Sequence, residues 1–134
     1  MSNSQAIGVA YSDPEFTTCY ATQEIGYSTA AQGTVTQATD KATGVTLNKS
    51  AGRINMNGAA LAGSTAVSFT LTNSLISTND TIIVCISGGG TAAAYTTYVS
   101  SMTAGSAVIT LRNLTASTSL SEAVIINYAI IHGQ

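Results

Sequence analysis

The chain has 134 residues, a net charge of −2 and only 7% charged residues, where an average soluble domain has about 25%. Its basic residues are too few and too scattered for the patch that phosphate binding needs, so we expect no nucleic-acid partner; they are Lys41, Lys49, Arg53 and Arg112. No stretch approaches the roughly 18 uninterrupted apolar residues of a membrane span, and the first residues lack the features of a secretory signal. We therefore expect one domain, made in the cytoplasm, with no membrane partner.

Residues 1–32 differ from the rest of the chain. Gly8, Pro14 and Gly26 interrupt them, and no apolar period of 2 or 3.6 residues persists. They nevertheless carry half of the aromatic residues, namely Tyr11, Phe16, Tyr20 and Tyr27. We interpret residues 1–32 as an extended N-terminal arm that packs on its own domain, on a neighbouring subunit or on another protein.

From Gly33 onward, runs rich in β-branched residues alternate with turn residues. The pattern predicts strands over residues 34–39, 45–47, 53–57, 67–72, 81–86, 95–99, 107–113 and 123–131, with a weak helical option at 59–62. Residues 81–86 and 123–131 are apolar on both sides, which is typical of strands covered on both faces, so Cys85 is expected in the core.

This spacing predicts an all-β fold. We expect an antiparallel β-sandwich or jelly roll of seven to eight strands over residues 33–134. Residues 65–73 resemble residues 105–113. Either β-hairpins share this pattern of a turn followed by alternating residues, or a unit of several strands was duplicated. A disulfide between Cys19 and Cys85 is possible, although a reducing compartment disfavours it.

Residues that carry chemistry are sparse. The lone histidine, His132, lies near the C-terminus, and we expect it to be an exposed end rather than a catalytic base. Solvated structural roles account for the six carboxylates, which are Asp13, Glu15, Glu24, Asp40, Asp80 and Glu122. The sequence therefore predicts a protein that is not an enzyme and that holds no metal and no cofactor.

Two features suggest contact with other copies of the chain. Tyr95 and Tyr98 lie three apart on a predicted strand, so they point to opposite faces. We expect one to face the core and the other to lie in a subunit interface or to stack on a sugar. A surface poor in charge loses little when it is desolvated, so we expect a homo-oligomer, and a trimer in particular.

Several segments resemble small virion proteins of tailed bacteriophages: residues 33–49 (GTVTQATDKATGVTLNK), 52–57 (GRINMN), 67–74 (VSFTLTNS), 109–113 (ITLRN) and 120–128 (LSEAVIINY). The resemblance covers residues 33–131. Members of this group are capsid decoration (cement) proteins or domains of tail fibres. The resemblance implies an all-β structural protein of the virion without catalytic residues.

Our leading hypothesis is a capsid decoration protein that forms trimers on the shell and whose arm reaches onto the major capsid protein or onto a neighbouring copy. The alternative is a receptor-binding or connector domain of a tail fibre or spike. In that case the exposed loops at 87–94 and 113–121 would touch host glycan.

Overall fold

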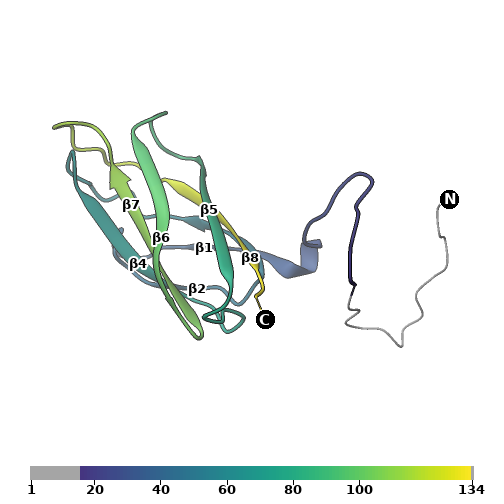
Figure 1. Cartoon of the computed structure of the whole chain (residues 1–134). Helices are drawn as coiled ribbons and strands as arrows, with labels where there is room; N and C mark the ends of the chain where they lie inside the picture. Colours follow the sequence, from purple (N-terminus) through teal and green to yellow (C-terminus); the bar gives the residue numbers. More distant parts are fainter. Residues whose placement is uncertain (1–15, 134) are drawn as a thin grey trace.

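Eight strands form two four-stranded sheets in the computed structural model, which describes residues 16–133 (Figure 1). A 3-10 turn, η1 (Thr29–Ala31), comes before the strands. The eight strands, in chain order, are β1 (Gln32–Thr36), β2 (Val45–Thr46), β3 (Ala51–Asn55), β4 (Ala66–Thr72), β5 (Thr81–Gly88), β6 (Tyr95–Thr103), β7 (Ser106–Asn113) and β8 (Ile125–Ile131). The predicted all-β class is confirmed. The helical option at 59–62 is wrong, because Leu61 instead forms a β-bridge with Leu120.

The sheets have the strand orders β1-β3-β8-β5 and β2-β4-β7-β6. The chain passes to the opposite sheet at every connection except the β6–β7 hairpin. Two such crossings return the chain to its first sheet in its first direction, so β1 pairs with β3, and β2 with β4, in parallel. The prediction of wholly antiparallel sheets is therefore wrong at these two pairs, and both sheets are mixed.

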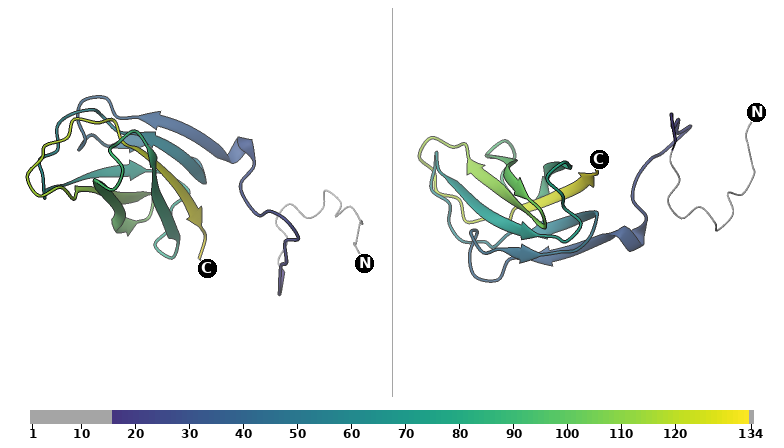
Figure 2. Two further views of the ribbon diagram at one scale, coloured as in Figure 1. Left: turned by 90° about the horizontal axis from the view of Figure 1, so that it is seen from above. Right: turned by 60° about the horizontal axis from the view of Figure 1, so that its bottom comes forward.

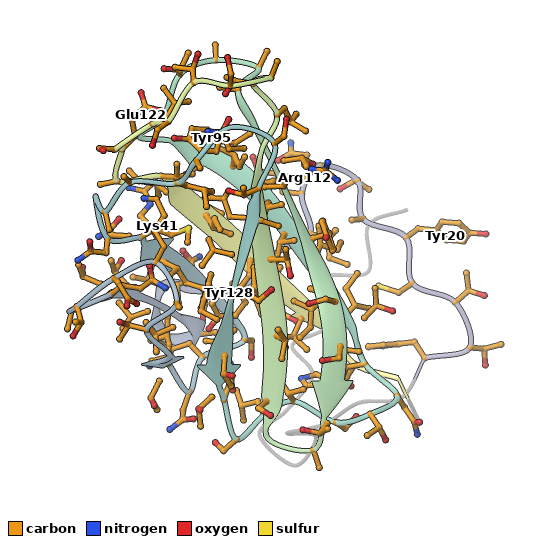
Figure 3. All side chains as sticks on the ribbon, turned by 90° about the vertical axis from the view of Figure 1, so that its left-hand side faces the viewer. Tyr20, Lys41, Tyr95, Arg112, Glu122 and Tyr128 are labelled. Carbon is orange, nitrogen blue, oxygen red and sulfur yellow. The ribbon has the colours of Figure 1, made fainter. Side chains whose placement is uncertain are left out.

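One core lies between the sheets. The inward residues of β4 are Phe69 and Leu71, as the alternation of its sequence predicts, and they face residues of the other sheet such as Ile54 and Ile126. This is a β-sandwich arrangement, and Figure 2 shows the two layers from two further directions. Tyr128 lies near the middle of the molecule (Figure 3), where its hydroxyl donates to the carbonyl of Lys49 over 2.9 Å.

Strands β5 and β8 alternate between buried and exposed residues, although both were predicted to be covered on both faces. Ile82 is buried and Ile83 is 53% exposed, and Ile130 is buried while Ile131 is 55% exposed. The prediction that Cys85 lies in the core is wrong, because Cys85 shares the outward face of β5 with Ile83. β5 and β8 pair with each other edge to edge within one sheet. No second layer of the described chain covers their outward side chains.

Candidate interaction surfaces

Residues 16–28, here called the leading segment, form no strand or α-helix and are exposed throughout. In Figures 1 and 2 they lie outside the sandwich, beyond the start of β1. Three large side chains stand in solvent there, since Phe16 is 58%, Tyr20 90% and Ile25 85% exposed. Figure 3 shows Tyr20 pointing away from the sheets. Tyr11, predicted to belong to the same group, lies outside the described residues.

The end of the leading segment is fastened to the sandwich. The Tyr27 hydroxyl donates to the backbone carbonyl of Ile130 in β8, and the Gln32 side chain donates to the carbonyl of Tyr27 over 2.8 Å. Lys49, between β2 and β3, donates to the carbonyl of Ala30 over 2.8 Å. Tyr27 therefore serves as an anchor, whereas Phe16, Tyr20 and Ile25 remain uncovered.

Ile25, Gln32 and Lys49 were missed by sequence reasoning. The aromatic count overlooked the aliphatic Ile25, which is among the most exposed large side chains of the described chain. Lys49 and Gln32 bind backbone carbonyls, a contact that leaves no mark in the spacing of residue types.

Tyr95 and Tyr98 point to opposite faces of β6, as their spacing predicts. Tyr95 is buried, and that burial, with the neighbouring Glu122 carboxylate, raises its pKa to about 12. Tyr98 is 47% exposed on the outer face, opposite Thr110 of β7. Of the two, Tyr98 is available to a partner.

Thr110 organises the outer face around Tyr98. Its hydroxyl lies 2.8 Å from that of Ser68 and 2.9 Å from that of Ser100, on the two flanking strands. These bonds hold neighbouring side chains across three strands in fixed positions. The part of the face around Tyr98 is therefore an ordered surface of small hydroxyls, and the exposed Arg112 lies farther along β7 on the same side.

A second apolar surface lies on the outer side of β5 and β8, and we call it the outer patch. It contains Ile83, Cys85, Ala129 and Ile131; Ile83 lies opposite Ala129 in the sheet register. Arg53 of β3, opposite Asn127 of β8, lies beside the patch and is exposed. Its contact to the Asn127 side chain is long, at 3.5 Å.

Lys41 is buried, although it lies between the predicted strands 34–39 and 45–47. Its ammonium group donates to the backbone carbonyls of Asn57 and Glu122, so it joins three connections at one end of the sandwich. Burial lowers the pKa of Lys41, and the Glu122 carboxylate partly offsets this. Hydrogen bonds from Thr91 lower the pKa of Glu122 and tie the β5–β6 loop to the connection before β8. Together, the contacts of Lys41, Glu122 and Thr91 close this end of the sandwich.

Asp80 and His132 form a pair at the opposite end. The Asp80 carboxylate accepts from the Ser77 backbone over 2.7 Å and from the Gly133 backbone over 3.1 Å, and it lies 3.2 Å from His132 Nδ1. Asp80 is buried, so its predicted solvated role is wrong, and it serves as a structural residue of the turn before β5. The Ser77 backbone bond is the main cause that lowers the Asp80 pKa to about 2. The cluster fastens the end of β8 to the turn before β5.

Neither end brings together a recognisable metal site: within residues 16–133, no three His, Cys, Asp or Glu side chains are grouped to hold an ion. In the same part of the chain, no helix has the length and apolar character needed to cross a membrane. Comparisons with protein-family models, with curated proteins and with solved structures gave no match.

Proposed function

We propose that this chain is a structural protein of a bacteriophage virion, a decoration (cement) protein that binds the outside of the head and stabilises it. Its partners in this proposal are the major capsid protein and further copies of itself in a trimer. It acts by bridging subunits, without catalysis or a cofactor, after synthesis in the host cytoplasm. The resemblance over residues 33–131 and the charge content of 7% support this proposal.

The observation that carries the proposal is the leading segment. A β-sandwich poor in charged residues presents Phe16, Tyr20 and Ile25 on an exposed segment whose base is fixed by Tyr27. Covering each of these side chains is worth about 1.5–3 kcal/mol. We therefore assign the predicted arm, 1–32, to attachment; the jelly-roll connectivity of the body remains a prediction.

Many copies make such modest contacts sufficient. A trimer held together by its leading segments presents three copies of every shell-binding surface, and binding of the first raises the effective concentration of the others at the shell. Each bridge between capsid subunits then opposes their separation under internal pressure. Tyr98 and its hydroxyl-rich face supply a further surface toward the shell.

Co-sedimentation with expanded heads of the phage that encodes the chain tests this proposal. The wild-type chain should pellet with the heads, and a Phe16→Ser, Tyr20→Ser, Ile25→Ser triple variant should stay in the supernatant. Leu114→Ser is the matched control, because Leu114 is also an exposed apolar residue, at 51%, but lies after β7. Equal pelleting of the triple variant would refute the role of the leading segment, and a wild-type chain that never pellets would refute decoration.

A tail fibre or spike domain is the second candidate. The loops 87–94 and 113–121 lie side by side, because Leu114 donates to the carbonyl of Ala94 over 2.8 Å. A hollow of about 380 Å³ at the first of these loops is lined by residues that include Ile86, Gly90 and Tyr95. The copy number in purified virions separates the candidates, since a head protein scales with the major capsid protein and a tail protein is present in few copies.

A further inference from the structure

Two uncovered apolar surfaces occur on the same chain. Exposed large apolar residues gather on the leading segment, with Phe16, Tyr20 and Ile25, and on the outer patch, with Ile83 and Ile131. Soluble proteins seldom leave such surfaces open without a partner. Each surface lacks a covering partner within the described chain. Because both are apolar, each is suited to pack against the other.

The anchor of the leading segment places its base beside the patch. Tyr27 binds the carbonyl of Ile130, the residue next to Ile131 in β8. From there the segment leads away from the sandwich, so its own patch stays bare (Figures 1 and 2). From Phe16 to Ile25 an extended chain spans about 30 Å, which is enough to cross the outer face of a neighbouring copy.

The charges of the two surfaces are complementary. Glu24 is the one charged residue between positions 16 and 28. On the outer face of the sheet that holds β1, β3, β8 and β5, the strands contribute one charged residue, Arg53. Both side chains are exposed. Laying the segment over this face brings a single carboxylate to a surface with a single guanidinium group.

We propose that residues 16–25 of one copy cover the outer patch of a second copy, with Glu24 paired to Arg53 of that copy. A segment that meets a face is exchanged reciprocally in a two-fold dimer or passed head to tail around a closed ring, and the trimer proposed above requires the second arrangement. This rests on and deepens the proposed function: the leading segment joins the copies into the trimer, and the assembled trimer then meets the shell through its remaining surfaces. The contact itself requires no capsid.

The two native cysteines report on this contact, because Cys19 lies in the segment and Cys85 in the patch, both exposed and free. The full-length protein, without capsids, is treated with a short bis-maleimide and run on a denaturing gel. We expect cross-linked dimers and higher species in wild type, and their loss in both Cys19→Ser and Cys85→Ser. Intrachain cross-linking alone would show that the segment folds back on its own patch, and cross-linking that survives Cys19→Ser would show patch-to-patch packing. Either result overturns the proposal.

A charge exchange tests the pairing in the same assay. Glu24→Arg and Arg53→Glu should each weaken association by about 3- to 10-fold, and the double variant should restore it, because the pair is rebuilt with reversed signs. Ile83→Ser should also reduce cross-linking, whereas Leu114→Ser, an equally exposed apolar residue elsewhere, should not. If neither single charge variant weakens association, the pairing is refuted. Since no heads are present, failure of decoration leaves these results untouched.

Discussion

At the scale of single residues, two buried asparagines hold loops of the fold in place through hydrogen bonds to the backbone. Asn73 and Asn113 are fully buried and occupy equivalent places in the two similar stretches, 65–73 and 105–113. The side-chain oxygen of each accepts from the backbone two residues later, at Leu75 and Thr115, over 3.0 Å. Each amide also donates to a distant backbone carbonyl, that of Lys49 or Leu61. The sequence similarity therefore includes a shared loop-fixing device as well as alternation.

Asp80 gives the fold a dependence on acid. Its carboxylate has a pKa of about 2 in the folded chain against an ordinary 3.8, so the unfolded chain binds the proton more readily. Its contribution to the free energy of unfolding is fully present above about pH 4 and is lost as the pH falls toward 2. Urea unfolding between pH 2 and 5 should show a steeper loss for wild type than for Asp80→Asn. Parallel curves would contradict the role given to Asp80.

The β6–β7 hairpin is the one connection that stays within a sheet, and it depends on Gly105. This residue has φ +83°, a conformation that costs side chains other than glycine, while open space surrounds the position of its missing Cβ. Gly105→Ala should therefore lower the free energy of unfolding by about 1 kcal/mol through backbone strain alone. Gly58→Ala is the control, with equally open space and no positive φ, and it should be neutral or slightly stabilising. Equal losses in the two variants, measured by urea unfolding, would contradict this explanation.

At the scale of strands, alternation predicted β4 and β7 well, since inward residues such as Phe69 and Ile109 follow a period of two. It failed for β5 and β8, where outward Ile83 and Ile131 look like core residues. Apolar composition favours burial of a side chain, but it does not show which face of the strand is packed against another layer. The same ambiguity explains the wrong placement of Cys85.

For the whole molecule, strand number and fold class could be predicted from the sequence, because turn residues separate the β-branched runs. The parallel pairs β1–β3 and β2–β4 could not, since they result from crossings between sheets that local patterns do not encode. The predicted partner-binding residues are placed in part: Phe16, Tyr20 and Tyr98 are exposed, and Tyr95 is buried. Tyr27 has a hydrogen bond to Ile130, a long-range contact beyond the reach of sequence patterns.

The charge content and the uncovered apolar surfaces lead to one view of the molecule, in which its surface is completed by neighbouring copies. A surface with few charges gives an isolated chain little protection against association. The same surface can be buried between copies at a small cost in desolvation free energy, because few charged groups lose their water. Self-association is thus the central claim on which bridging depends.

Light scattering during size-exclusion chromatography of the full-length chain tests that claim most directly. We predict three times the chain mass of 13.5 kDa at micromolar concentration, and a lower mass for the Phe16→Ser, Tyr20→Ser, Ile25→Ser variant. A wild-type chain that elutes with the mass of a single copy across this range would contradict the account.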